Sequence, residues 1–232
     1  QKEDITSSDI SRFKDYRVLF IGDSITANNY RARTNWVNYL TDELKITNFT
    51  NGGISGSGLI RNGSGTNWID GLASYDNNYD LILIMGDMND WSHGTDFNAS
   101  NVGSYGDSTT STFYGALKVY LEAVLTKYPL AKIGWITSTP RNQQIGSSSD
   151  YLHGQSSVFA TANSVIKEMC NNYSIPVLEL YNESNLYPWI SANNQEYFKS
   201  DVEDLPADAI HPNSKGQKIM EIKIKDFVIR NF

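Results

Sequence analysis

The chain of 232 residues has one cysteine, Cys170, and only three histidines. A single cysteine excludes an internal disulfide and a cysteine-rich metal site. Its place in the apolar pattern of an expected helix predicts a buried, inert thiol. Histidine is the side chain whose ordinary pKa lies nearest neutrality. His93, His153 and His211 are therefore the few candidates for a base that works at neutral pH.

Long apolar runs and an excess of positive charge are also missing. No run approaches the roughly 20 residues that a membrane-spanning helix needs, so we expect no membrane span. Lysine and arginine number 19 against 26 aspartates and glutamates, a net charge of −7. That charge argues against nucleic-acid and anionic-membrane partners. The chain begins at Gln1 without a signal peptide, which indicates a mature secreted protein or a domain cut from a longer one.

What the chain does contain is an alternation of short apolar runs with longer amphipathic ones. The β-branched, apolar runs predict strands at 16–22, 80–86, 131–139 and 175–181, and a weaker, polar run that ends in glycines predicts a strand at 47–53. The amphipathic runs predict helices at 34–46, 111–128, 156–173 and about 214–230. Thr34 is the expected N-cap of the first of these helices. This order predicts a three-layer α/β/α fold. Its flavodoxin-like parallel sheet would have five strands in the order 2-1-3-4-5. Residues 16–232 are expected to form one domain, preceded by a loosely packed polar lead-in at 1–15.

In such a sheet the ligand crevice lies beyond the carboxyl ends of the strands. That rule selects Gly22-Asp23-Ser24 after the first strand and Asn51-Gly52-Gly53 at the end of the second. It also selects Asn89-Asp90 after the third strand, the loop 140–155 and the segment before the last helix. Four separated segments are therefore expected on one rim.

A serine that attacks a carbonyl needs a base, a partner that orients the base, and donors for the oxyanion. His211 precedes the last helix, and Asp208 lies three residues earlier, a spacing that lets a carboxylate meet one imidazole nitrogen in a turn. We expect Ser24 to begin a helix, whose free N–H groups favour developing negative charge. Gly53 can offer an unobstructed backbone N–H, and Asn89 can offer a side-chain amide. Each block alone is more often a turn or a cap; their combination in this order is what favours chemistry.

These four blocks resemble the markers of the SGNH hydrolase superfamily, also called the GDSL esterase/lipase family. The matching residues are Gly22-Asp23-Ser24, Asn51-Gly52-Gly53, Asn89-Asp90 and Asp208 to His211, and together they span nearly the whole chain. The resemblance implies Ser24 as nucleophile, His211 as base and Asp208 as its partner. It also implies an oxyanion hole from the Ser24 and Gly53 N–H groups and Asn89, with no metal or organic cofactor.

The third block departs from the family pattern. Asp87 stands two residues before Asn89, where the family usually has glycine. A carboxylate there could change the local turn or reach a substrate hydroxyl. Trp91, Tyr151 and Trp189, which lie in rim segments, are further candidates for contacts with sugar or acyl groups; packing against the sheet is the alternative for each. His93 and His153 are expected to be solvated loop residues, with a contact to substrate at the mouth of the crevice as the alternative for each.

The resulting hypothesis is a serine esterase that removes short acyl groups, such as acetyl, from carbohydrate or a cell-surface glycopolymer. A rim rich in asparagine and tyrosine favours such a substrate. The alternatives are a lipase, lysophospholipase or thioesterase for longer acyl chains, and a weakly active carbohydrate-binding module. An extracellular location is expected, secreted, on a cell surface or on a phage particle, as part of a longer or oligomeric protein.

Overall fold

The computed structural model describes residues 10–27, 31–86, 88–92, 97–98, 100–142 and 158–232. Its centre is a sheet of five strands in the order β2-β1-β3-β4-β5, and every neighbouring pair is parallel. The strands are β1 (Arg17–Gly22), β2 (Asn48–Gly53), β3 (Leu81–Met85), β4 (Lys132–Ile136) and β5 (Val177–Leu178). The predicted strand order and the parallel pairing are confirmed.

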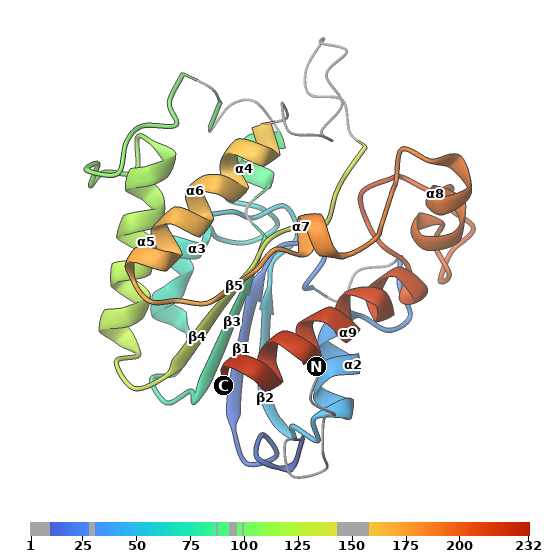
Figure 1. Cartoon of the computed structure of the whole chain (residues 1–232), viewed down its shortest axis with the longest axis horizontal. Helices are drawn as coiled ribbons and strands as arrows, with labels where there is room; N and C mark the ends of the chain where they lie inside the picture. The colour runs from blue at the N-terminus through green and yellow to red at the C-terminus, as the bar shows by residue number, and fades with distance from the viewer. Residues whose placement is uncertain (1–9, 28–30, 87, 93–96, 99, 143–157) are drawn as a thin grey trace.

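Helices cover both faces of this sheet, as Figure 1 shows. One layer contains α3 (Trp68–Gly71), a 3-10 helix (Leu72–Ser74), α5 (Phe113–Lys127) and α6 (Val158–Asn172). The other contains α2 (Trp36–Glu43) and α9 (Ser214–Asn231). Three further helices follow β3 and β5, namely α4 (Asn89–Ser92), α7 (Leu180–Glu183) and α8 (Ser191–Phe198). This is the three-layer α/β/α arrangement predicted from the sequence.

The continuous apolar runs in the strands arise because the sheet has a core on each face. Successive side chains of a strand point to opposite faces. In β3, Ile82 and Ile84 pack in the core with residues of α3, α5 and α6, whereas Leu81 and Leu83 pack in the core with α2 and α9. A strand covered on both sides therefore has no polar positions to alternate.

Several helix and strand boundaries differ from the prediction. The N-cap of α2 is Asn35, whose side chain accepts from the Asn38 N–H, so the prediction of Thr34 as cap is wrong. The last strand was predicted at 175–181, but β5 ends at Leu178, because the chain turns into α7 two residues later. The long helices at 113–127, 158–172 and 214–231 lie within three residues of their predicted bounds.

The segment before the first strand is not a loose lead-in where it is described. Phe13 has no exposed surface and belongs to the core under α2 and α9, with Ile10 and Tyr16 packed against that core. An aromatic side chain buried in this way ties residues 10–16 to the domain. Residues 1–9 lie outside the described residues. Cys170 is fully buried, and burial raises the pKa of its thiol to about 12, which confirms the predicted inert cysteine.

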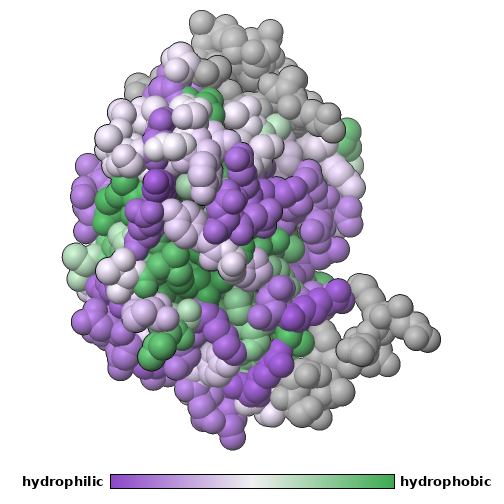
Figure 2. Space-filling view, turned by 60° about the vertical axis from the view of Figure 1, so that its left-hand side comes forward, coloured by the Kyte–Doolittle hydropathy of each residue, from purple (hydrophilic) through white to green (hydrophobic). Residues whose placement is uncertain are grey.

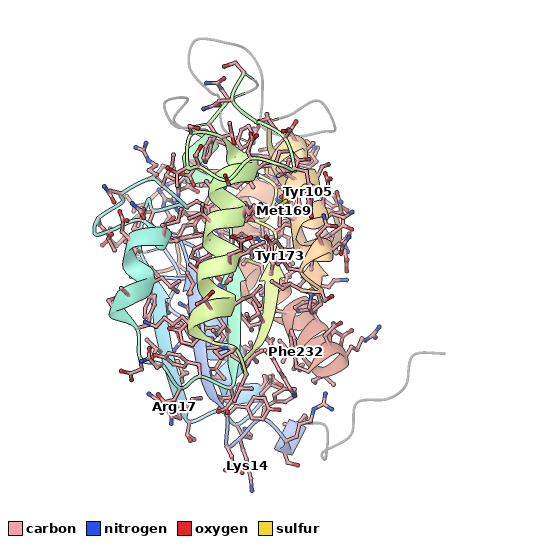
Figure 3. All side chains as sticks on the ribbon, turned by 90° about the vertical axis from the view of Figure 1, so that its left-hand side faces the viewer. Lys14, Arg17, Tyr105, Met169, Tyr173 and Phe232 are labelled. Atoms are coloured by element: carbon pink, nitrogen blue, oxygen red, sulfur yellow. The ribbon has the colours of Figure 1, made fainter. Side chains whose placement is uncertain are left out.

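The two ends of the sheet carry different parts of the chain. Lys14, Arg17 and Phe232 lie at the amino end of the strands in Figure 3, and the loops that carry the sequence blocks lie at the opposite end.

On the face shown in Figure 2, hydrophobic residues gather near the middle and hydrophilic residues surround them. No helix in the described part of the chain is both long and apolar enough to cross a bilayer.

Candidate active site

The turn that follows β1 carries the first sequence block. Asp23 C=O accepts hydrogen bonds from the Thr26 and Ala27 N–H groups at 3.1 and 2.9 Å, which closes a turn over Ser24. A side chain at Gly22 would place its Cβ 2.1 Å from Thr26 Oγ1, so only glycine fits there. Residues 24–26 form this turn and not the first turn of a helix. The prediction that Ser24 begins a helix is therefore wrong, because residues 24–27, the described part of this segment, form no helix.

Ser24 meets a residue from the far end of the chain. Its Oγ lies 3.0 Å from His211 Nε2, although 187 positions separate the two residues. The other ring nitrogen, His211 Nδ1, lies 2.6 Å from Asp208 Oδ2. Ser24 is 7 % exposed, and the side chains of His211 and Asp208 are 24 % and 20 % exposed. The three side chains thus form one chain of hydrogen-bond contacts that ends near the surface.

Hydrogen bonds to the Asp208 carboxylate hold the turn from Asp208 to His211. Asp208 Oδ1 accepts the N–H groups of Ile210 and His211 at 3.0 and 2.9 Å, which leaves Oδ2 for the imidazole. Ala209, between Asp208 and Ile210, has a φ of +59°, a left-handed conformation that costs an L-residue free energy. Burial pushes the pKa of the Asp208 carboxyl up, but hydrogen bonds from the His211 ring and from the two backbone N–H groups outweigh it and hold that pKa below its usual value.

Asp208 and Asp23 each pair with an arginine, and the sequence analysis predicted neither pair. Arg31 Nε lies 3.0 Å from Asp208 Oδ2, and its guanidinium also donates to Pro206 C=O at 2.9 Å. Arg141 donates to Asp23 Oδ2 at 3.2 Å, and both of these side chains are almost completely buried. Neither arginine belongs to a sequence block, and each comes from a segment distant from its partner. Only three-dimensional proximity identifies them.

The two predicted amide donors lie beside the Ser24 turn. A Cβ at Gly53 would be 2.3 Å from Ala27 N, so the end of β2 packs directly on that turn. The Gly53 N–H donates to Asn51 Oδ1 at 3.0 Å. Asn89 Nδ2 donates to Ser57 C=O at 2.9 Å and lies 3.4 Å from Asp23 Oδ2. Both donors therefore have protein acceptors in this conformation, and their place in an oxyanion hole stays a prediction.

Asp90, next to Asn89 in the third block, has a positional role that sequence reasoning missed. Its buried carboxylate accepts the N–H groups of Leu59, Ile60 and Arg61 at 2.6, 3.3 and 2.9 Å. A Cβ on Gly58 would be 2.2 Å from the same carboxylate. The acidic residue of the third block thus anchors the loop that follows the second block. The available signal was a carboxylate in the helix that follows a buried strand, together with a glycine-rich loop after the second block.

The predicted aromatic contacts separate into a buried and an exposed group. Trp91 is 1 % exposed, and its ring lies 4.9 Å from the Phe113 ring and 6.0 Å from the Phe97 ring, between centroids. The prediction that Trp91 contacts substrate is wrong, because a side chain buried in this cluster has no surface to offer. Trp189 is 36 % exposed and packs against the exposed Tyr187, so its role as a contact stays a prediction. Asp87, Tyr151, His93 and His153 lie outside the described residues.

The described residues hold no group of three or more histidines, cysteines and carboxylates arranged to bind a metal ion. What the arrangement can do chemically follows from its hydrogen bonds. An imidazole at 3.0 Å can take the proton of the Ser24 hydroxyl, and a carboxylate at its other nitrogen can stabilise the resulting positive charge.

Comparisons with known proteins show which family this chain is similar to. The model of the GDSL-like lipase/acylhydrolase family matches residues 20–219. A Lactobacillus plantarum protein of known structure is 26 % identical with a TM-score of 0.77, over 94 % of this chain and 98 % of that one. A structure from Chitinophaga pinensis described as a possible lipase is 18 % identical, TM-score 0.70, over 93 % of this chain and 98 % of that one.

A more distant fold match is the inhibitor-bound aryl esterase of M. smegmatis, 13 % identical with a TM-score of 0.57, over 94 % of this chain and 100 % of that one. No curated protein matches the chain. The family match covers most of the sequence and includes both Ser24 and His211. The chain therefore belongs to the GDSL-like lipase/acylhydrolase family of the SGNH superfamily and is a serine ester hydrolase.

Proposed function

We propose that Ser24, His211 and Asp208 form the catalytic triad of this hydrolase. The observation that carries the proposal is the continuous contact from Asp208 Oδ2 through both ring nitrogens of His211 to Ser24 Oγ, at 2.6 and 3.0 Å. A serine hydroxyl is a weak nucleophile at neutral pH, and an adjacent oriented base supplies what it lacks.

The reaction follows from these positions. Ser24 Oγ attacks the ester carbonyl while His211 Nε2 takes its proton, and Asp208 stabilises the imidazolium without taking a proton itself. The imidazolium then protonates the leaving alcohol, which leaves an acyl group on Ser24. Water, deprotonated by the same imidazole, attacks the acyl-enzyme; the bond between the acyl group and Ser24 Oγ breaks, the imidazolium returns its proton to Oγ, and the acid is released. Donors for the oxyanion are proposed to be the Ser24 and Gly53 N–H groups and the Asn89 amide.

For the two predicted donors, this role requires an exchange of partners. The Gly53 N–H would have to turn from Asn51 to the substrate oxygen, or share its hydrogen between them. Losing one oxyanion donor costs roughly 10²–10³ in kcat. We expect Asn89→Ala to reduce kcat by that factor, and a smaller loss would assign the donor role elsewhere in the rim.

The test of the triad is Ser24→Ala assayed with p-nitrophenyl acetate. Removing the nucleophile is expected to lower kcat by roughly 10⁴–10⁶. Circular dichroism and thermal unfolding check that the variant keeps its fold. Ser74→Ala is the matched control, because Ser74 also uses its hydroxyl in a local hydrogen bond, to Gly71 C=O, on a helix outside the rim. Hydrolysis by Ser24→Ala near the rate of the control would defeat the proposal.

For the substrate we propose short acyl esters on carbohydrate. The supporting observation is the exposed pair Tyr187 and Trp189, 44 % and 36 % exposed, since aromatic faces suit sugar rings. A series of p-nitrophenyl esters from acetate to laurate tests the acyl part. Preference for octanoate or laurate would favour the lipase or thioesterase alternative.

The carbohydrate part has its own test. Wild type and Ser24→Ala are incubated with acetylated glycans, and released acetate is measured by mass spectrometry. Release by the wild type alone supports the proposal. Glycan binding without acetate release, together with no fluorophosphonate labelling of Ser24, would favour the binding module. An extracellular polymer also requires export, so detection of the protein only in the cytosol of its cell would contradict this substrate.

A further inference from the structure

A buried ion pair stands directly behind the proposed nucleophile. Asp23 Oδ2 lies 3.2 Å from the Arg141 guanidinium, and the side chains are 2 % and 3 % exposed. The other oxygen, Asp23 Oδ1, accepts the Ile25 N–H at 2.8 Å. The carboxylate therefore holds the residue that follows Ser24 while Asp23 itself precedes Ser24. Anything that fixes the direction of this carboxylate fixes the turn that carries the hydroxyl.

The residue next to Arg141 contacts the other half of the proposed triad. The Asn142 N–H donates to Ala209 C=O at 3.1 Å, and Ala209 lies between Asp208 and His211 in the left-handed conformation described above. Arg141 and Asn142, which are consecutive in the segment after β4, thus bind the turn that contains Ser24 and the turn from Asp208 to His211, respectively.

Arg141, which anchors the segment after β4, is held in buried surroundings. Arg141 is 2 % exposed, and its guanidinium carbon lies 5.9 Å from the centroid of the buried Phe159 ring on α6. In such surroundings a carboxylate and a guanidinium attract each other far more strongly than in water. Asp23 itself is too buried, and too firmly paired, to serve as an acid or base for substrate. The mechanism above assigns no role to the Asp23–Arg141 pair, although the pair is buried next to Ser24.

We propose that Arg141 is a positioning residue that sets the separation of Ser24 and His211. Through its ion pair it holds the Asp23 turn, and through Asn142 the same segment holds the Asp208–His211 turn, so that hydroxyl and imidazole stay at hydrogen-bond distance. The same Asp23 oxygen also lies 3.4 Å from Asn89 Nδ2, so the pair aligns a proposed oxyanion donor as well. This role rests on the proposed function of Ser24 and His211.

Removing the guanidinium is expected to impair turnover more than substrate binding. A displacement of reacting groups by about 1 Å can cost roughly 10²-fold in rate. Arg141→Met keeps much of the buried volume and removes the charge. We expect its kcat on p-nitrophenyl acetate to fall roughly 10²-fold, with KM within about twofold, and fluorophosphonate labelling of Ser24 to slow by a similar factor. Arg141→Lys, which can restore charge but not the planar fork, is expected to recover only part of kcat.

A double variant separates positioning from stability. Arg141→Met alone leaves the Asp23 carboxylate buried without its partner, which lowers stability. Asp23→Asn combined with Arg141→Met removes both charges and is expected to regain thermal stability without regaining kcat. It also provides a folded protein to assay if the single variant fails to fold. Recovery of kcat together with stability would overturn the positioning role, as would wild-type kcat in either variant.

A matched control uses a buried charge elsewhere. Glu221 on α9 has no exposed surface and lies 2.7 Å from Lys218 Nζ. Glu221→Gln is expected to lower the melting temperature and leave kcat within about twofold of wild type, because its effect does not reach the Ser24–His211 contact. If Ser24→Ala retains activity, the proposed function fails. If Ser24→Ala is inactive while Arg141→Met turns over normally, only the positioning role fails.

Discussion

The two turns that meet at the candidate active site each contain an aspartate paired with an arginine, yet the pairs differ in burial. Asp23 and Arg141 are 2 % and 3 % exposed, whereas Asp208 and Arg31 are 20 % and 11 % exposed. The closest atoms of the two pairs are at similar distances, 3.2 and 3.0 Å. Burial, and not distance, distinguishes them.

The difference in burial separates a charge with a structural role from a charge with a proposed role in catalysis. A buried pair is costly to break, because removing one partner leaves the other charge without water or a counter-ion. A carboxylate that remains near water can respond to a change of charge on its neighbouring imidazole. Asp23 therefore suits a fixed anchor for the nucleophile, and Asp208 suits a partner for a base that gains and loses a proton in every turnover.

The largest expected effect comes from the carboxylate that touches the imidazole. Asp208→Asn keeps the shape of the side chain but presents a neutral amide to His211 Nδ1. We expect kcat/KM for p-nitrophenyl acetate to fall roughly 10⁴-fold, because the imidazolium loses its counter-charge and the tautomer is no longer enforced. The melting temperature should change little. A loss of less than tenfold would remove Asp208 from the proposed triad.

The second effect is on stability and comes from the buried pair. Asp23→Asn leaves Arg141 charged and unpaired, so the free energy of unfolding should fall by about 3–5 kcal/mol. Urea unfolding followed by circular dichroism measures it. Asp226→Asn is the matched control: its partner Arg230 is 57 % exposed at 3.5 Å, and such exposed pairs contribute about 0–1 kcal/mol. Equal losses in the two variants would contradict the distinction drawn from burial.

The third effect tests the more open pair. Arg31→Gln removes a cation from Asp208 and one donor to Pro206 C=O, but Asp208 keeps its two backbone N–H bonds and the imidazole. A loss of about 1 kcal/mol, roughly fivefold in kcat/KM, is expected. Steady-state kinetics at a fixed neutral pH measures it. A loss as large as that of Asp208→Asn would show that Arg31 is part of the chemistry.

The smallest effect extends the comparison to an exposed carboxylate. Hydrogen bonds from Lys218 and then from Lys225 lower the pKa of Glu43 to about 2 from 4.5. Because the folded pKa is the lower one, its stabilising contribution is complete above about pH 4.5 and is lost as the pH falls toward about 2. Its side chain is 39 % exposed, so solvent screening keeps the contribution small.

The measurement compares wild type and Glu43→Gln by urea unfolding across that acid range and at neutral pH. The variant should be less stable at neutral pH, and the difference should shrink as the pH approaches 2. A difference independent of pH would mean that the Lys218 and Lys225 contacts do not act through charge.

Prediction from the sequence was most accurate where a local pattern matches a repeated physical requirement. A buried parallel strand must be apolar on both faces, and β3 could be found from that rule alone. Boundaries were less accurate, because Asn35 and Thr34 are both good N-cap residues and the sequence does not say which of them caps α2. Trp91 follows the third block immediately, and sequence position could not show that its ring turns into the core.

The amino-acid sequence by itself determined the order of strands and helices, the residues of the proposed triad and the end of the sheet where they meet. It could do so because hydrophobic periodicity is local and because parallel strands bring their carboxyl ends to one edge. Only the tertiary structure decided that Asp23 binds Arg141, that Arg31 binds Asp208 and that Asp90 anchors the loop of the second block. Such ion pairs and hydrogen bonds join segments far apart in the chain, and their energy depends on burial, which no short stretch of sequence contains.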